Sequence, residues 1–333
     1  MICFLLHHRV ASVLAVIGAG LLSCAAAAQS CAPLEGSAPA IMAGLSQHIA
    51  GEAPGLATLA PPFGPPQGDM DPKLQAFLGG QRDFAFLTRE ISEPDLAAFR
   101  RGHQGRDPVV LPIAAGAWNR FGYVDAVVVI VNRANPLRSI SLRDLDSIFS
   151  ATRQRGGAAV TMWRQLGIKG ALGDQPIRIM GSGAWAKTES ARALTIRRHV
   201  LSTERAAGIW RAVPDGGSEA EVVERVGGDR AAIGFTGAGH LSAAVRAIAV
   251  EGLAATPRSA ANGRYPLLRT VDLLFDAPGG AADARTAALA AWLLSAKGQA
   301  AIARQGDFAP LPKPALRQAR RQLAQLGTRT ACH

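Results

Sequence analysis

The stretch that most constrains the fold is Asp125–Val131, with the sequence Asp-Ala-Val-Val-Val-Ile-Val. Its residues after Asp125 are all apolar, and most of them are β-branched, which favours a strand. A strand that is apolar on both faces has to be covered on both faces, as in the parallel sheets of α/β proteins. The sequence therefore predicts a strand here that is buried inside a layered α/β fold.

Other strand and helix patterns alternate along the chain, which is typical of α/β folds. A run rich in proline and glycine at 61–68 predicts a loop, because proline lacks a backbone N–H and glycine weakens regular elements. Strands are predicted at Arg82–Leu87, Ile177–Met180, Ala231–Thr236 and Val271–Phe275, and helices at Asp95–Arg100, Ser141–Phe149, Ala184–Leu201, Asp283–Arg304 and Pro314–Leu326.

Length and composition indicate two packed cores. The chain has 333 residues, of which 48% are hydrophobic and 18% are charged. A single hydrophobic core rarely extends over more than about 250–300 residues. We therefore expect two lobes.

The first residues of the chain have the pattern of an export signal. Residues 1–28 carry a basic start, the apolar run Val10–Leu22 and a small-residue cleavage pattern at Ala26–Ala28. The apolar run is short for a membrane span, and no later stretch reaches about 18 consecutive apolar residues. We expect a soluble, periplasmic product. An alternative is lipidation at Cys24, although Leu22 fits that pattern poorly.

Two cysteines remain after cleavage behind Ala28, namely Cys31 and Cys332. Exported proteins meet oxidising conditions, in which such a pair can form a bridge. We expect a disulfide that joins the two ends of the chain, and the alternative is two unpaired thiols.

The formal charge of +11 favours anionic partners. Nucleic acid is disfavoured among them, because only 5% of the residues are aromatic and no arginine-rich block is interleaved with aromatic residues. A small oxyanion remains a candidate.

The segment Arg178–Ser190 carries the chemistry for holding such an anion. It combines the guanidinium of Arg178 with the turn Gly181–Gly183 at the start of a predicted helix, where free backbone N–H groups favour negative charge. Ser182 lies inside this turn, and in the alternative interpretation it is only the N-cap of the helix.

Several enzyme classes are excluded by spacing. The seven histidines show no paired metal-ligand spacing, so no metal site is predicted. Ser182 lacks the glycine that a nucleophile elbow requires two residues earlier, and no phosphate loop for nucleotides is present. The sequence therefore predicts a binding protein without a cofactor. A hydrolase using Ser182 would need a nearby base such as His199 or His240.

Taken together, segments in order between Asp83 and Pro312 resemble the phosphate-binding receptors of bacterial ABC importers, which are type 2 periplasmic binding proteins. The resemblance is carried by Thr88–Glu93, Val131–Leu137, Trp163–Gly167, Arg178 with Gly181–Gly183, Ala232–Phe235, Tyr265–Arg269 and Leu293–Gln299.

This resemblance implies an α/β protein with two lobes, each a mostly parallel sheet flanked by helices, joined by hinge strands. Lobe 1 would comprise 29–124 and 247–333, and lobe 2 would comprise 125–246. It implies a monomeric receptor that captures phosphate or a related oxyanion for an ABC permease, and the alternative is a sensor or protein-interaction module of the same fold. Oxyanion contacts are implied for Arg178, Ser182 and Gly183, with further candidates at Gly181, Ala184, Thr88, Arg89 and Ser37.

Two departures from the family pattern bear on the ligand. Ala184 stands where the family has threonine, and Arg89 stands where many phosphate receptors have an aspartate that accepts the ligand's proton. Arg89 either contacts a second edge of the anion or pairs with Glu90 or Glu93. Losing an acceptor and gaining a cation is expected to favour a fully ionised anion such as sulfate, or a larger organic acid.

Overall fold

The computed structural model describes residues 34–53, 55–59, 72–120, 122–181, 190–211 and 217–329. The predicted signal peptide, Cys24, Cys31, Cys332, the proline-rich run at 61–68 and Ser182–Ala184 lie outside these ranges. Within them, no helix is both long and apolar enough to cross a membrane.

The first lobe contains a five-stranded sheet with the order β2-β1-β3-β11-β4. Strands β1 (Leu34–Ser37), β2 (Ala57–Leu59) and β3 (Phe84–Leu87) are parallel. Strand β11 (Thr270–Phe275) runs antiparallel to both β3 and β4 (Val109–Ala115). Strands β1, β2, β3 and β4 therefore run in one direction and β11 runs against them, so this sheet is mostly parallel, as predicted.

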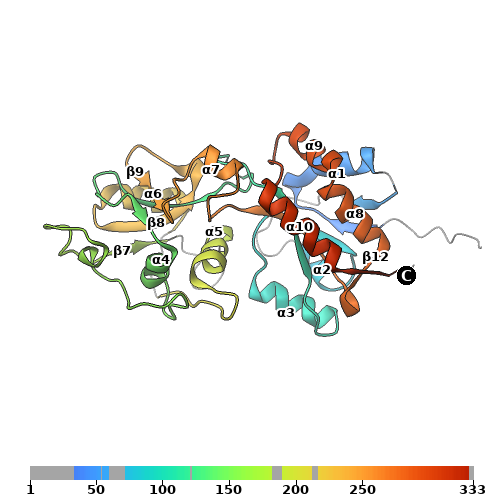
Figure 1. Cartoon of the computed structure of the whole chain (residues 1–333), viewed down its shortest axis with the longest axis horizontal. Helices are drawn as coiled ribbons and strands as arrows, with labels where there is room; N and C mark the ends of the chain where they lie inside the picture. Colours follow the sequence, from blue (N-terminus) through green and yellow to red (C-terminus); the bar gives the residue numbers. More distant parts are fainter. Residues whose placement is uncertain are drawn as a thin grey trace, which may run out of the picture. The chain divides into compact units, whose positions relative to one another are not determined.

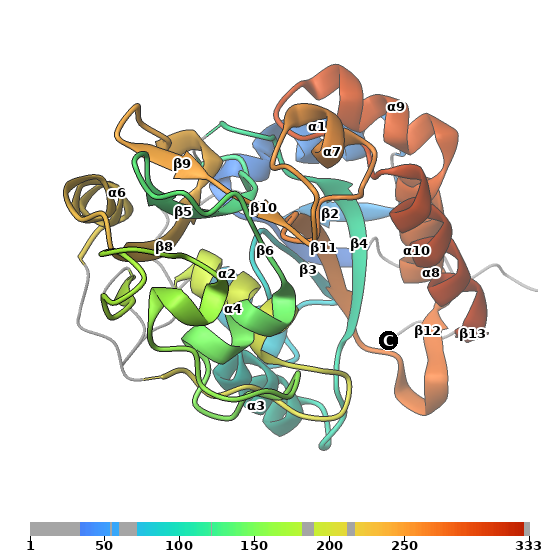
Figure 2. The ribbon, with the colours of Figure 1, turned by 60° about the vertical axis from the view of Figure 1, so that its left-hand side comes forward.

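Helices cover both faces of this sheet, because alternate residues of each strand point to opposite faces. Phe84 and Phe86 pack in one core with helices α1, α8, α9 and α10, whereas Ala85 and Leu87 pack in another with α2 and α3. Figure 2 shows α8, α9 and α10 together on one side of β4. These helices are α1 (Ala43–Glu52), α2 (Pro72–Leu78), α3 (Glu93–Gly102), α8 (Ala284–Leu294), α9 (Ala296–Gln305) and α10 (Lys313–Gln325).

The second lobe contains a four-stranded sheet with the order β7-β8-β5-β9. Strand β5 (Val127–Asn132) is buried on both faces, as predicted, since the side chains of residues 127–131 are fully buried. It pairs antiparallel with both of its neighbours, β8 (Ala232–Gly237) and β9 (Val245–Ala247). The remaining neighbouring pair of this sheet, β7 (Arg178–Met180) and β8, is parallel. The predicted parallel setting of β5 is therefore wrong, because burial on two faces depends on covering helices and not on strand direction.

Helices again provide this cover. One core contains residues of α4 and α5, and a second, on the opposite face, contains residues of α6 (Figure 1). The side chain of Ser141 caps α4 by accepting a hydrogen bond from the Asp144 N–H; from the sequence, Ser139 and Ser141 were both candidates for this cap. The elements are α4 (Leu142–Phe149), α5 (Ala191–Ile196), its continuation η5 (Arg197–Leu201) and α6 (Glu219–Gly228).

The core of the second lobe that contains residues of α4 and α5 continues beyond the boundary expected at residue 246. Ile248, Val250, Tyr265 and Leu267 pack in it. The chain leaves this lobe only at the segment that leads into β11. Shorter elements are β6 (Ser139–Ile140), β10 (Ala249–Val250), β12 (Ala281–Asp283), β13 (Gly327–Arg329), α7 (Pro257–Ala261), η1 (Ala40–Met42), η3 (Trp163–Leu166), η6 (Ala238–His240) and η7 (Pro278–Gly280).

Two segments connect the lobes, one between β4 and β5 and the other before β11. They lie side by side, because the Gly116 N–H donates to the Arg269 carbonyl at 3.1 Å and the Val127 N–H donates to the Leu267 carbonyl at 3.1 Å. The predicted division into two lobes joined by hinge strands agrees with this arrangement.

The helix predicted over Asp283–Arg304 is two helices that meet at Ser295. This residue is extended, its hydroxyl accepts from the Gly298 N–H, and its own N–H donates to the Trp292 carbonyl. Gly298 permits the tight turn, because a Cβ there would lie 2.2 Å from the Trp292 carbonyl oxygen. A serine N-cap therefore interrupts an alanine-rich helical pattern.

Candidate functional site

The carboxyl ends of β1 and β3 form one edge of the first sheet, where open α/β sheets bind their ligands. Strand β1 ends at Ser37, which is 2% exposed and whose Oγ has no hydrogen-bond partner among the described residues. Thr88 directly follows β3, and its carbonyl accepts a hydrogen bond from Arg269 Nη2 at 2.9 Å. A buried hydroxyl without a partner is rare in proteins, so Ser37 has a free donor at the expected ligand position.

The second lobe has a matching edge at the ends of β7 and β8. Gly181 follows β7 and is buried. Asp125 lies just before β5, which is antiparallel to β8, so it stands at the same edge. The carboxylate of Asp125 is fully buried and accepts hydrogen bonds from Arg192 Nη2 at 2.7 Å and from the Gly239 N–H at 3.0 Å.

Arg192, in the first turn of α5, binds a second carboxylate. Its Nε lies 2.9 Å from Glu219 Oε2, and its side chain is 13% exposed. Glu219 is the first residue of α6, and its Oε2 also accepts from the Gly237 N–H at 3.1 Å. His240 Nε2 lies 3.7 Å from the same oxygen. The loop after β8 and the starts of α5 and α6 therefore meet around Arg192.

Arg269 connects the two edges. Its Nη1 lies 3.7 Å from Asp125 Oδ1, and its Nη2 donates to the Thr88 carbonyl. Its buried Nε has no hydrogen-bond partner among the described residues. Burial and then the charge of Arg192 lower the pKa of Arg269 to about 10, although Asp125, Glu219 and Glu90 act in the opposite direction. We call Asp125, Arg192, Glu219 and Arg269 the arginine–carboxylate cluster.

A glycine makes room for this cluster. A Cβ at Gly237 would lie 2.1 Å from Asp125 Oδ2 and 2.7 Å from Arg192 Nε. Both distances are far shorter than a van der Waals contact, so only glycine allows the backbone of β8 to pass this close to the two charged groups.

Arg178, the cation predicted from sequence, lies at the other end of β7. It is the first residue of the strand, and its side chain is 45% exposed. Its Nε and Nη2 both donate to the carboxylate of Asp229. The hydrogen bond from Arg178 is the main cause that lowers the pKa of Asp229, so this carboxylate stays ionised beside the guanidinium.

Arg89, the second predicted cation, is bound within its own loop. Nη1 and Nη2 donate to the two oxygens of Asp95 at 2.5 and 3.2 Å, and Nη1 also donates to the Glu90 carbonyl at 3.0 Å. Burial acts to raise the pKa of Asp95, but the hydrogen bond and charge of Arg89 outweigh it and lower this pKa. Arg89 therefore neutralises an acidic helix start, with Asp95 rather than Glu90 or Glu93 as the carboxylate partner.

Helix α5 begins at Ala191, whereas Ala184, where the sequence predicted the start of a helix, lies outside the described residues. Ser190 is the N-cap, and its hydroxyl accepts from the Ala193 N–H at 3.2 Å. The structure thus brings Arg192 to the edge where the sequence analysis placed Ser182. The serine at 190 was the available signal, because serine is among the favoured N-cap residues.

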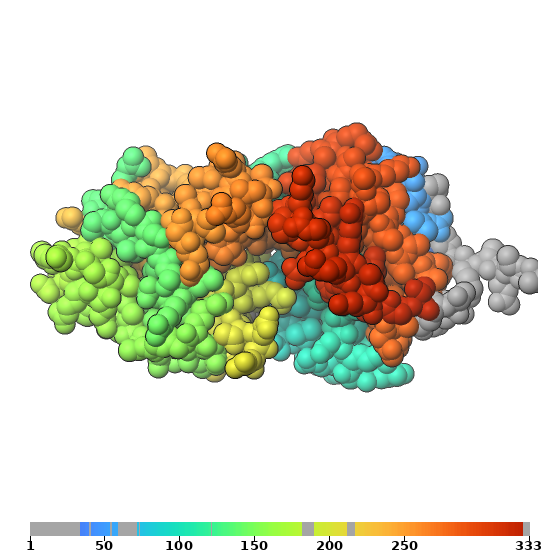
Figure 3. All heavy atoms as spheres, in the orientation of Figure 1, coloured from blue at the N-terminus to red at the C-terminus, as the bar shows by residue number. Residues whose placement is uncertain are grey.

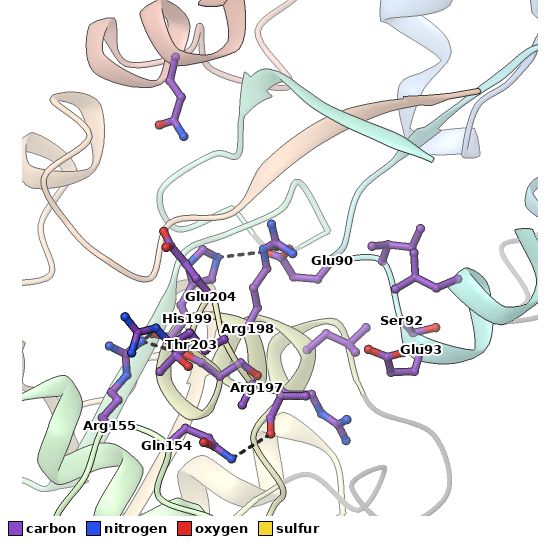
Figure 4. A pocket seen from close by; sticks show the side chains of 18 residues that line it. Glu90, Ser92, Glu93, Gln154, Arg155, Arg197, Arg198, His199, Thr203 and Glu204 are labelled. Carbon is purple, nitrogen blue, oxygen red and sulfur yellow. Dashed lines mark hydrogen bonds and ion pairs between the residues drawn. The ribbon is translucent and has the colours of Figure 1, made fainter. Parts of the chain in front are cut away.

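A cavity of about 1190 Å³ has Glu90 in its lining, whereas none of the four residues of the arginine–carboxylate cluster lines it. The first lobe contributes the loop after β3, the start of α3 and Gln318 of α10, whereas the second lobe contributes η5 and residues 202–207 (Figure 4). Figure 3 shows the surface of these segments, with α10 in red, α3 in teal and residues 190–211 in yellow. Among the described residues, no group of three or more His, Cys, Asp or Glu is placed to hold a metal ion.

Two α/β lobes joined by two crossing segments, with the buried Arg269 and the largely buried Arg192 where the strand ends meet, define a two-lobed binding protein. Residues 72–297 match the model of the PBP superfamily domain, and the chain belongs to this family. The resemblance inferred from the sequence is therefore confirmed at the level of the family.

Relatives and solved structures agree with this assignment. The phosphate-binding protein PstS of Pseudomonas aeruginosa PAO1 is 27% identical over 257 residues, which is 74% of each chain. Protein SphX of Synechococcus elongatus is 28% identical over 251 residues, 73% of this chain and 67% of that protein. The fold is shared with an ABC-type phosphate transport receptor from Vibrio cholerae (19% identity, 84% of this chain and 100% of that chain, TM-score 0.52) and with PstS from Borrelia burgdorferi (15%, 84% and 98%, TM-score 0.51).

Proposed function

We propose that this protein is an exported receptor that captures phosphate or a related oxyanion and delivers it to an ABC importer in the membrane. The observation that carries the proposal is the position of Arg269, which contacts both lobes and has a buried Nε with no hydrogen-bond partner in the described part of the chain. The names of the relatives, a phosphate-binding protein and a phosphate transport receptor, support phosphate as the ligand.

The cluster offers the donors that an oxyanion requires. Arginine presents a planar set of N–H groups that matches two oxygens of phosphate. Ser37 adds a hydroxyl whose oxygen is buried and has no partner among the residues that the structure describes. Micromolar binding requires about 8 kcal/mol, and each charge-assisted hydrogen bond contributes roughly 1.5–3 kcal/mol before ordering costs. About four or five such bonds would be sufficient, and Arg192, Arg269, Ser37 and free backbone N–H groups would provide them.

The carboxylates of the cluster favour phosphate over sulfate. Asp125 and Glu219 accompany the two arginines, so the cluster carries no net charge when all four groups are ionised. A protonated oxyanion can donate a hydrogen bond to a carboxylate, whereas sulfate only accepts. Arg89 adds no free cation, because it is bound to Asp95. We therefore propose phosphate in place of the sulfate-like anion that the sequence departures favoured.

The residues inferred from the sequence remain a second proposal for the position of the site. In that version Arg178, Ser182 and Gly183 contact the anion. In the version proposed from the structure, Arg192 and Arg269 do so. The two versions differ in which arginine is required, and a matched pair of substitutions in the Discussion separates them.

Export, a monomeric state and handover to a permease belong to the same proposal. They rest on the pattern of residues 1–28 and on the relatives' names, and they imply neither an enzyme nor a cofactor. Mass spectrometry of the protein secreted by an expressing bacterium would give the first residue of the mature chain, and cleavage behind Ala28 is the expected result. An acylated Cys24 would replace the soluble product by an anchored one.

Isothermal titration calorimetry of the purified protein with phosphate, sulfate and small carboxylates tests the ligand. Phosphate is expected to bind with micromolar affinity or better, and at least tenfold more tightly than sulfate. If no oxyanion binds below about millimolar, the receptor function is wrong.

A further inference from the structure

Glu90 forms ion pairs between the lobes. It lies two residues after Thr88, in the first-lobe loop that carries the proposed ligand edge. Its Oε1 is 3.1 Å from His199 Nε2 and its Oε2 is 3.2 Å from Arg198 Nε, both on η5 of the second lobe (Figure 4). The side chain of Glu90 is 12% exposed, so this contact is largely removed from water.

The surroundings keep Glu90 ionised. Burial acts to raise its pKa, but the hydrogen bond and charge of His199, together with the charges of Arg198 and Arg269, outweigh burial and lower it. Arg269, a member of the arginine–carboxylate cluster, therefore interacts with Glu90 as well. A change of charge at the arginine–carboxylate cluster therefore changes the electrostatic energy of the contact between the lobes.

Both partners of this contact are held in place. On the second lobe, Arg155 donates to the carbonyls of His199 at 2.7 Å and Val200 at 2.6 Å, which fixes the end of η5. On the first lobe, the Thr88 carbonyl is bound by Arg269. A bond from Glu90 to η5 therefore sets the position of the ligand loop relative to the second lobe.

We propose that Glu90 is a positioning residue for ligand capture, which holds the first-lobe loop against η5 so that Ser37, Thr88 and the two buried arginines converge on one anion. The Glu90 latch consists of Glu90, Arg198 and His199. This role depends on the proposed receptor function. In it, the Glu90 latch is the contact that couples closure of the lobes to binding of the anion.

One buried carboxyl group that interacts with the latch titrates near neutral pH. Burial, followed by the charge of Glu90, raises the pKa of Asp272 to about 7. Protonation of Asp272 removes a negative charge that repels Glu90, so the latch strengthens as the pH falls. The other charged groups of this cavity and of Arg269's surroundings are Glu93, Arg155, Arg197, Glu204, Arg205, Arg192, Asp125 and Glu219.

Three variants of the purified full chain test this role: Glu90→Gln, His199→Gln and, as a control, Glu93→Gln. Glu93 lines the same cavity and loses the same charge, but it has no ion pair with η5 among the described contacts. Phosphate affinity is measured by calorimetry at about pH 5.5 and pH 8, and the radius of gyration is measured by X-ray scattering with and without phosphate.

Glu90→Gln is expected to weaken phosphate binding by about tenfold at both pH values and to increase the radius of gyration. His199→Gln removes the ring that contacts Glu90 Oε1 and should weaken phosphate binding several-fold. Glu93→Gln should stay within about twofold. Phosphate itself changes its protonation between pH 5.5 and pH 8 in every measurement. The affinity of each variant is therefore compared with that of the wild type at the same pH.

The result that overturns the proposal is a Glu90→Gln protein with wild-type affinity and wild-type radius of gyration. Equal losses in Glu90→Gln and Glu93→Gln would also overturn it, since the effect would then be general electrostatics. If the wild type binds no oxyanion, the receptor function fails, and the scattering comparison of ligand-free proteins still decides whether Glu90 holds the lobes together.

Discussion

Arg192 Nη2 lies 2.7 Å from Asp125 Oδ1, although 67 residues separate the two in the chain. Asp125 is fully buried at the point where the chain enters the second lobe, and Arg192 lies in the first turn of α5. The pair fixes this helix start against the crossing segment. A buried carboxylate left without its arginine is strongly destabilising, so the two positions depend on each other.

Arg192→Lys should weaken phosphate binding by at least tenfold. Lysine keeps the positive charge near Asp125 but loses the planar set of donors that contacts a carboxylate and an anion together. Calorimetry gives the affinity, and a urea titration checks that the protein remains folded.

Arg178→Lys is the matched control for Arg192→Lys. Arg178 is bound to Asp229 and half-exposed, so its replacement should change phosphate affinity by less than about threefold and unfolding free energy by about 1 kcal/mol at most. The reverse pattern, with binding lost only in Arg178→Lys, would place the site at the residues inferred from the sequence.

Gly237→Ala should reduce phosphate binding by tenfold or more, because its Cβ would displace Asp125 and Arg192 from each other. Gly228→Ala is the control, since a Cβ at this position at the end of α6 meets nothing within 4 Å. Binding curves for both variants, measured beside circular dichroism spectra, separate a local effect from unfolding. Equal affinities in the two variants would contradict the role of the cluster.

Asp272→Asn should remove a pH dependence of stability. Burial, followed by the charge of Glu90, raises the pKa of Asp272 to about 7 from a reference of 3.8. A raised pKa of the folded state means that this group's stabilising contribution is present below the unfolded pKa and is lost as the pH rises to about 7. The asparagine variant should therefore gain stability relative to the wild type between about pH 4.5 and 8, on the order of a few kcal/mol. Urea titrations of both proteins at about pH 4.5 and about pH 8 measure the difference between their unfolding free energies. The same difference at both pH values would show that Asp272 does not titrate in this range.

Trp163→Phe should destabilise the protein by about 1–3 kcal/mol, because the buried indole Nε1 donates to the Ala231 carbonyl at 3.0 Å and its loss leaves that oxygen without this donor. Trp292→Phe is the comparison, since its buried Nε1 has no hydrogen-bond partner among the described residues. The unfolding free energies of the two variants are compared in urea. A larger loss at Trp292 would show that ring packing, and not the hydrogen bond, determines the cost.

Local elements could be predicted from the sequence where a pattern depends on near neighbours. The helix capped by Ser141 and the strand at 127–132 lie close to where they were expected, since capping and apolar runs act over a few residues. The break at Ser295 and the N-cap at Ser190 were missed. Both serines lie inside helical patterns, and the pattern alone does not tell which serine caps a helix.

The sequence by itself determined the class of this protein: an α/β chain with two cores and a family pattern that extends over most of its length. Strand direction, the partners of Arg89 and Arg178, and the arginine–carboxylate cluster were decided only by the tertiary structure. Asp125, Arg192, Glu219 and Arg269 are spread over 145 residue numbers from first to last, as their positions 125 and 269 give. Pairing between charges so distant in the chain depends on how the two lobes fold and cross, and no local pattern records it.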